Sequence, residues 1–249
     1  MSDDSRVDDV PDLGDFDLQI PKRSATLRAM VEDKLRQAIS AGRFRPGQRL
    51  IERELCEMIG VGRTSIREAL RQLEAEGLIT SHPHRGPSVS SISLEEAKQL
   101  YSVRALLESY SGQEFATKGS AEDIDRLESK VAKFALAADR FEADPNANTR
   151  RDLIEAKTSF YGCLMEGGRN VFVQQMLKLL HNRVTLLRIT SMTQPGRLQH
   201  SVDEIRDILA AIKARDGQRA ADACRVHIER AADTAIAYLA KVEEPTGGS

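Results

Sequence analysis

Residues 50–79 constrain the fold more than any other part of this 249-residue chain, because they combine two short amphipathic helical patterns with a tight turn, Gly60-Val61-Gly62. The second pattern opens with side chains that can contact DNA: Arg63, Thr64 and Arg67. Two helices joined in this way form a helix-turn-helix, whose second helix enters the major groove with its N-terminal residues. The sequence therefore predicts a DNA-reading unit here.

A third helix is expected before this unit. Residues 24–41 carry apolar side chains at four-residue spacing, which make one stripe along a helix: Leu27, Val31, Leu35 and Ile39. Gly42 is a natural C-terminal stop for that helix. Apolar positions should hold the two helices of the helix-turn-helix together, with Val61 of the turn buried between them: Leu55, Ile59, Ile66, Leu70 and Leu73.

A short hairpin is expected after the second helix, which Gly77 should end. Residues 78–80 and 89–92 have strand-forming sequences, and residues 82–87 between them are basic and typical of a turn. Three helices and a two-stranded hairpin make a winged helix. Arg85-Gly86 at the hairpin tip would enter a neighbouring minor groove, since glycine permits a close approach of the backbone.

Charge is distributed unevenly, although the formal net charge is only −2. Residues 23–92 hold twelve Lys and Arg against eight Asp and Glu, an excess of +4. Residues 1–22 hold seven Asp against two basic residues, and we expect them to form a disordered acidic tail. A basic excess around the helix-turn-helix suits phosphate binding. On charge alone, a merely solvated basic surface is an equal alternative.

Individual roles can be assigned to the basic residues of the helix-turn-helix. Arg63 and Arg67 can fork onto guanine, and Thr64 can reach a phosphate or a thymine methyl group. Arg53, near the start of the preceding helix, is placed for a contact to the DNA backbone. The alternative for Arg67 is an ion pair with an acidic residue of the solvated surface: Glu57, Glu68 or Glu74.

From Ser93 onward the sequence has helical patterns throughout. Helices are expected near residues 94–118, 120–141, 151–166, 170–191, 199–215 and 217–241. No room is left for a sheet, so residues 93–241 should form an all-α antiparallel helical bundle, followed by a flexible tail over 242–249. The predicted fold class is mainly α, with a winged helix-turn-helix over 23–92 before this bundle.

The rest of the composition bears on compartment and on catalysis. No apolar run reaches the length of a membrane span, and three cysteines lie far apart in helical contexts. We therefore expect a cytoplasmic protein without a membrane partner. An enzyme is the alternative class, but the helical half shows no nucleophile–base pair or paired-carboxylate site at useful spacing. Asp203-Glu204 and Glu243-Glu244 are interpreted as helix-cap and tail charges.

The N-terminal third resembles the winged helix of GntR-family bacterial transcription regulators. Four stretches and the wing carry the resemblance: residues 35–50, 52–55, 60–70, 73–78 and Arg85-Gly86. In that family the residues that match the following positions contact the operator: Arg53, Arg63, Thr64, Arg67 and Gly86. Gly62 departs from the pattern, because the family usually has Ser there. The departure removes one hydroxyl that could bind phosphate.

The helical half resembles the FCD effector domain of the FadR-like branch of this family, over about residues 94–240. The stretches that carry it are residues 103–108, Phe160 with 168–170, 204–216 and 223–228. Six helices rather than seven place the chain nearer the VanR-like arrangement. The resemblance implies a homodimer whose two winged helices read a palindromic operator, and a small-molecule effector that relieves repression.

Many FCD domains hold a divalent metal through one Asp and three His. At those positions the alignment places Lys157, Tyr161, Ile205 and His227. A cationic Lys repels a metal ion and Ile205 offers no donor, so we expect no metal and no other cofactor. His181 is interpreted as a packed or interface histidine rather than a ligand.

In the family the metal ion helps to anchor a carboxylate of the effector, assisted by an arginine that matches Arg104. The hypothesis is therefore a metal-free pocket for a small organic carboxylate. Lys157 would supply the positive charge, with Tyr161 and His227 as neutral hydrogen-bond partners. Two alternatives stay open. In the first, Lys157 points to solvent and Tyr161 is an ordinary core residue. In the second, the pocket is vestigial and the helical half only dimerises.

Overall fold

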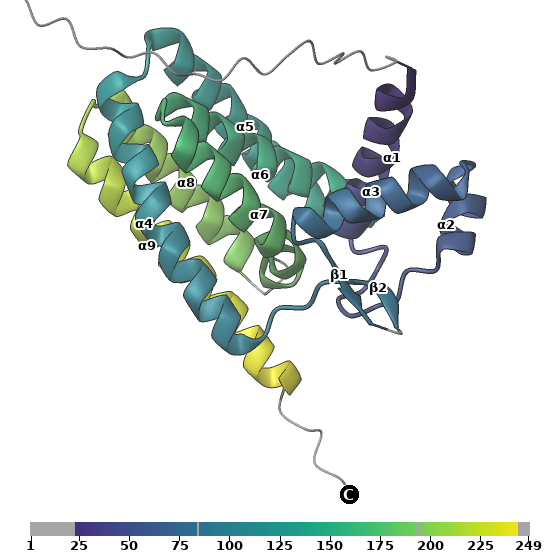
Figure 1. Ribbon diagram of the computed structural model, residues 1–249. Helices are drawn as coiled ribbons and strands as arrows, with labels where there is room; N and C mark the ends of the chain where they lie inside the picture. The colour runs from purple at the N-terminus through teal and green to yellow at the C-terminus, as the bar shows by residue number, and fades with distance from the viewer. Residues whose placement is uncertain (1–22, 84, 193, 195, 244–249) are drawn as a thin grey trace, which may run out of the picture.

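The structure, a computed structural model, describes residues 23–83, 85–192, 194 and 196–243. Along the chain the elements are α1 (Arg23–Ser40), α2 (Glu52–Ile59), α3 (Arg63–Ala75), β1 (Ile79–His82), β2 (Gly86–Val89), α4 (Leu94–Lys118), α5 (Ala121–Ala143), α6 (Ala147–Gly167), α7 (Val171–Met192), α8 (Arg197–Lys213) and α9 (Gly217–Glu243). Figure 1 shows α1–α3 and the hairpin on the right and the other helices as a bundle on the left. The predicted class, mainly α with a winged helix and a helical bundle, is confirmed. The expected acidic tail over 1–22 lies outside the described residues.

One hydrophobic cluster joins α1, α2, α3 and the hairpin. Its members include most of the predicted apolar positions: Val31, Leu35, Ile39, Leu55, Ile66, Leu70 and Leu73. Ile59 and Val61 are only partly buried against this cluster, and Leu27 is 46% exposed. A strict four-residue spacing advances about 40° further than a full helical turn at each step, so the ends of such a stripe cannot face one core.

α3 ends where the sequence predicts, in a Schellman motif at Gly77. The backbone N–H of Gly77 donates to the carbonyl of Glu74 and that of Leu78 to the carbonyl of Leu73, both at 2.9 Å. Gly77 has φ +76°, a left-handed conformation that glycine adopts without strain. This motif directs the chain from the recognition helix into β1.

The hairpin differs from the prediction in its second strand. β2 ends at Val89, where the strand was expected to begin, and β1 pairs with it antiparallel from Ile79–Val89 to His82–Gly86. Residues 47–50 lie along the other edge of β2, since Val89 N–H donates to Gln48 O at 2.9 Å and Leu50 N–H to Pro87 O at 2.8 Å. Pairing on both sides fixes residues 86–89 as the strand, and residues 90–92 lead out to α4.

The six helices α4–α9 form the second hydrophobic core. α4 packs along α9, α5 along α6, α8 against both α9 and α5, and α7 against α4 (Figure 1). Capping boxes at Ser93, Ser120 and Asn146 set the starts of α4, α5 and α6. The Asn146 cap explains why α6 begins at Ala147, four residues before the expected start.

Two further points concern the ends and the surface of this half. α9 continues to Glu243, so residues 242 and 243 are helical and not part of a tail as expected, and residues 244–249 lie outside the described residues. None of the described helices combines the length and apolar character needed to cross a bilayer.

Candidate DNA interface and buried polar cluster

The front of α3 presents the residues predicted to read DNA. Arg63, Thr64 and Arg67 are exposed and share one face of the helix, while Ile66 on the opposite face is fully buried. The N-cap residue Gly62 makes no side-chain cap hydrogen bond. The first backbone N–H groups of α3 therefore keep their capacity to bind a phosphate.

Arg67 forms an ion pair, but its partner differs from those considered in the sequence. Its Nε donates to both carboxylate oxygens of Glu52, at 3.0 and 2.9 Å, and this hydrogen bonding raises the pKa of Arg67. Glu52 starts α2, and the turn between the helices brings it to α3. The two side chains are 57% and 30% exposed. An ion pair this exposed contributes little, so DNA can displace it.

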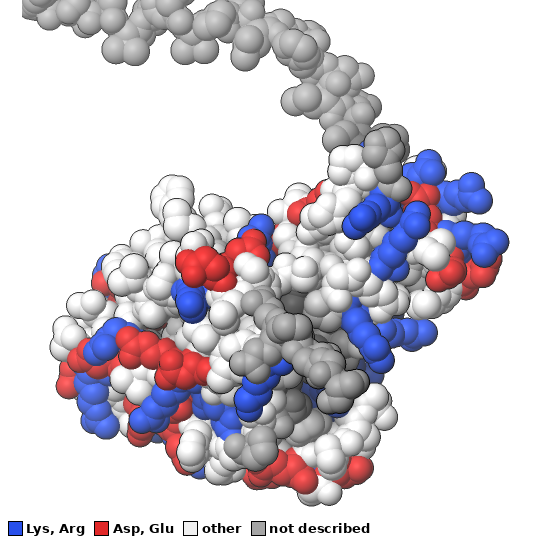
Figure 2. Space-filling view, turned by 90° about the horizontal axis from the view of Figure 1, so that it is seen from below, with Lys and Arg blue, Asp and Glu red and all other residues white. Residues whose placement is uncertain are grey.

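The wing carries two arginines: Arg85, which the sequence analysis predicted, and Arg49, which it did not identify. Arg85 is exposed beside Gly86, which has φ +75°. Arg49 pairs with Ser88 at the outer edge of β2, and its guanidinium lies 4.0 Å from the place that a Cβ on Gly86 would occupy. Arg49 and Arg85 thus flank the same end of the hairpin. In Figure 2 most of the coloured side chains on the right are Lys and Arg, with a few acidic ones among them, whereas acidic and basic side chains alternate on the left.

The interior of the bundle holds a set of polar and charged side chains, which we name the buried polar cluster: Arg104, Glu108, Lys157, Tyr161, His181, Arg197, Ser201, Glu204 and His227. Helices α4, α6, α7, α8 and α9 contribute them. All four predicted effector residues belong to the cluster, and each is at most 3% exposed. Chain folding therefore brings these four positions together inside the bundle.

One side of the cluster is organised around Glu108. Arg104 Nε donates to Glu108 Oε1 at 2.8 Å, and His181 Nε2 lies 2.9 Å from the same oxygen. Burial opposes ionisation of Glu108, but the charge of Arg104 and the contact with His181 lower its pKa to about 2. Because an ionised carboxylate only accepts hydrogen bonds, His181 must carry a proton on Nε2.

The other side of the cluster is a chain from Tyr161 through His227 to Glu204. His227 Nδ1 lies 2.6 Å from Glu204 Oε2, and its Nε2 lies 2.8 Å from Tyr161 Oη. Burial lowers the pKa of His227 to about 4, so the ring is neutral at pH 7. Glu204 is ionised and also accepts from Arg197 at 2.9 Å. His227 therefore donates from Nδ1 to Glu204 and accepts from the Tyr161 hydroxyl at Nε2.

Lys157 is buried in the bundle and does not point to solvent. Its ammonium donates to Ser201 Oγ at 2.8 Å and lies 5.4 Å from the centroid of the Phe134 ring. The alternative in which Lys157 points to solvent is therefore wrong.

The four positions at which many FCD domains ligate a metal do not fit a divalent cation here. Lys157 and Tyr161 are engaged with Ser201 and His227, and Ile205 is fully buried in the hydrophobic core. Among the described residues, no group of three or more His, Cys, Asp or Glu side chains is arranged to hold a metal. Only His227 has a donor of the expected kind.

Two sequence interpretations need correction. Glu204 is not a helix-cap charge but a buried centre of the cluster, bonded to His227 and Arg197. The helical repeat contained a signal for this, since Glu204 falls three residues after buried Ser201 and four before buried Ile208. His181 is packed as expected, but it also belongs to the cluster through Glu108.

Two family profiles match the sequence: "Bacterial regulatory proteins, gntR family" over residues 27–89 and "FCD domain" over residues 99–230. The chain is 25% identical over 188 residues to the uncharacterized HTH-type transcriptional regulator YdhC of Bacillus subtilis. This match covers 76% of this chain and 81% of YdhC. It is 27% identical over 200 residues to the HTH-type transcriptional repressor GlaR of Escherichia coli, and this match covers 78% of this chain and 89% of GlaR.

The fold is also found among solved structures. E. coli McbR/YncC superposes with a TM-score of 0.70 at 22% identity, covering 87% of this chain and 98% of McbR. The matching families consist of transcriptional regulators, which confirms the prediction of a regulator over the enzyme alternative. The chain belongs to the GntR family of DNA-binding transcriptional regulators, in the FadR-like branch that carries an FCD domain.

Proposed function

We propose that this chain is a homodimeric, metal-free repressor that reads a palindromic operator and responds to a small organic carboxylate. The observation that carries the proposal is the buried polar cluster, in which α4, α6 and α9 supply the four residues that match the family's effector site and α7 and α8 supply charged and polar partners. Its relative GlaR is named a repressor, which supports the direction of regulation. An operator on chromosomal DNA implies that the protein acts in the cytoplasm.

The proposed DNA contacts come from α2, the front of α3 and the wing: Arg53, Arg63, Thr64, Arg67, Arg85 and Gly86. Arg63 and Arg67 would contact base edges, and Arg53 would contact a phosphate beside the groove. Arg49 joins this set, because its place beside Gly86 puts a second guanidinium where the wing meets the DNA backbone. Such contacts add affinity that depends on salt but not on sequence.

An apolar surface on α4 and α7 supports the dimer. Large exposed hydrophobic side chains line both helices: Val103, Leu106, Tyr110, Val171, Phe172, Met176 and Leu179. Leu106 and Phe172 are 73% and 70% exposed, and Asn170, which directly precedes α7, donates from Nδ2 to Tyr110 Oη of α4 at 3.3 Å. Apolar surface of this extent marks an interaction site, and two-fold symmetry pairs it with itself.

Selection of DNA from a random duplex pool tests the dimeric reading. We expect an enriched sequence with two inverted half-sites, because each protomer places one α3 in the major groove. A single unrepeated half-site would contradict the dimer, and no enrichment would contradict sequence-specific reading by α3.

The charge and donors of the cluster support an anionic effector. Its basic residues are Arg104, Lys157 and Arg197, against two acidic residues, Glu108 and Glu204. Arg104 Nη2 is buried 2.7 Å from Glu108 Oε1, but among the described residues it makes no hydrogen bond of good geometry. A buried donor in this condition favours a ligand that supplies an acceptor.

A carboxylate of the effector would receive hydrogen bonds from Arg104 and Lys157, while Tyr161 and His227 orient its neutral part. Because these side chains are at most 3% exposed, entry of the ligand requires local opening of the bundle. Removing the ammonium with Lys157→Gln should therefore abolish the response to carboxylates.

A further inference from the structure

Three consecutive residues of α7 connect the buried polar cluster to the recognition helix: His181, Asn182 and Arg183. His181 faces the cluster, since its Nε2 lies 2.9 Å from Glu108 Oε1 and its ring centroid lies 4.7 Å from that of Tyr161. Asn182 and Arg183 face the other way, toward the C-terminal end of α3. One turn of one helix therefore touches both functional parts of the molecule.

Arg183 packs directly on the end of the recognition helix. A Cβ at Gly77 would lie 2.9 Å from Arg183 Nε and 3.3 Å from its Cγ, so a larger residue at Gly77 would require the Arg183 side chain to shift. Asn182 Nδ2 lies 3.5 Å from Glu76 Oε2, and Arg36 of α1 donates to both oxygens of Glu76 at 3.0 Å. α7 thus contacts the point where α1 and α3 meet.

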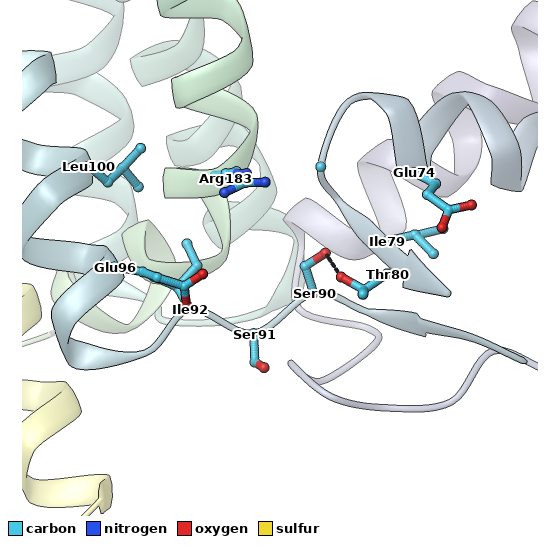
Figure 3. A pocket seen from close by; sticks show the side chains of 10 residues that line it. Glu74, Ile79, Thr80, Ser90, Ser91, Ile92, Glu96, Leu100 and Arg183 are labelled. Atoms are coloured by element: carbon cyan, nitrogen blue, oxygen red, sulfur yellow. Dashed lines mark hydrogen bonds between the residues drawn. The ribbon is translucent and has the colours of Figure 1, made fainter. Parts of the chain in front are cut away.

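A cavity of about 280 Å³ lies around this contact, lined by residues of both halves. Figure 3 shows Arg183 extending from α7 into it, with Glu96 of α4 on one side and Glu74 of α3 on the other. Hydrogen bonds from Ser93 lower the pKa of Glu96, and the charge of Arg183 lowers it further. The guanidinium therefore has carboxylates of both halves nearby and space in which to move.

We propose that Arg183 is a positioning residue that fixes the winged helix against the bundle, and that α7 transmits the state of the buried polar cluster to α3. The proposal rests on the cluster being the effector site. A ligand carboxylate on Arg104 competes with Glu108, which is also the acceptor of His181. Because residues 181–183 belong to one helix, a shift of His181 moves Arg183 against Gly77.

The positioning role is tested with the full chain and its selected operator. The measured quantity is the ratio of affinities for the selected operator and for one with a base pair inserted between the half-sites. We expect Arg183→Ala to lower this ratio about fivefold or more, because the two winged helices lose their fixed separation. Arg183→Lys should retain part of it through charge. Arg206→Ala, which removes an exposed arginine of α8, should leave it unchanged.

The same experiment can overturn the positioning role. A ratio that stays at the wild-type value in Arg183→Ala would do so, provided circular dichroism shows that the variant is folded.

Transmission is tested by amide hydrogen exchange over residues 72–82, without any ligand. We expect Glu108→Gln to raise exchange there about fivefold in the wild-type background, because the change at the cluster reaches Gly77 through α7. In the Asn182→Ala/Arg183→Ala background it should cause no further rise. An equal rise in both backgrounds, or none in the wild type, would overturn the proposal.

His181→Gln provides a second perturbation of the cluster if Glu108→Gln does not fold, and the same two outcomes apply. Since no effector is used, these results are independent of whether carboxylates bind. If carboxylates release the operator but Glu108→Gln raises exchange equally in both backgrounds, the proposed transmission through α7 is wrong and the proposed function still stands.

Discussion

Replacing Arg63 with alanine should weaken binding to the selected operator by about tenfold to a hundredfold and relax the base preference at one position of each half-site. Arg63 is exposed at the first residue of α3, beside an N-terminus without a side-chain cap. A guanidinium there reaches base edges, and alanine supplies no replacement. Fluorescence anisotropy with the operator and its single-base variants measures both effects.

Arg49→Ala is the matched comparison, because it also removes one exposed arginine from the same half of the molecule. We expect it to weaken all sequences alike and to reduce the slope of log K against log salt by about 1 for each lost phosphate contact. Unchanged operator affinity in both Arg63→Ala and Arg67→Ala would contradict the docking through α3.

Glu108→Ala should lower the free energy of unfolding by about 3–5 kcal/mol, the largest stability effect that we expect. The variant leaves the Arg104 guanidinium buried beside two tyrosine rings, 5.1 and 5.5 Å from their centroids, without its carboxylate. It also removes the acceptor of His181. Urea unfolding followed by circular dichroism measures the change.

The control for this prediction removes both charges. Arg104→Met with Glu108→Leu replaces the pair by apolar side chains of similar volume, which is often neutral or stabilising. We therefore expect the double variant to be more stable than Glu108→Ala. Glu229→Ala removes an exposed carboxylate of α9 and serves as the reference. If Glu108→Ala were as stable as Glu229→Ala, burial of the Arg104 charge would not depend on Glu108.

Most of the fold could be predicted because its signals are local. Gly77 ends α3 and Ser93 begins α4 through hydrogen bonds within a few residues, and these bonds follow from residue type and position. The second strand was misplaced because its position depends on residues 47–50, which pair with it from about forty residues away. Periodicity within 86–92 contains no information on that partner.

The residues of the candidate sites could also be predicted only where their signals are local in the sequence. The front of α3 is visible in the sequence because three contact residues occur within five positions, whereas Arg49 reaches the wing only through the same non-local pairing. Family resemblance supplied four positions of the buried polar cluster. It did not supply their partners Glu108 and Glu204, because a charged residue in a helix is first assigned to the solvent face.

The central claim is that the buried polar cluster controls operator binding through a carboxylate and without a metal. The direct measurement is the affinity of the full chain for its selected operator in the presence of EDTA, with and without each member of a panel of mono- and dicarboxylates. We expect at least one carboxylate to lower the wild-type affinity about fivefold or more, and no such change with Lys157→Gln. A panel without effect, a response that needs an added divalent metal, or a full response in Lys157→Gln would contradict the claim.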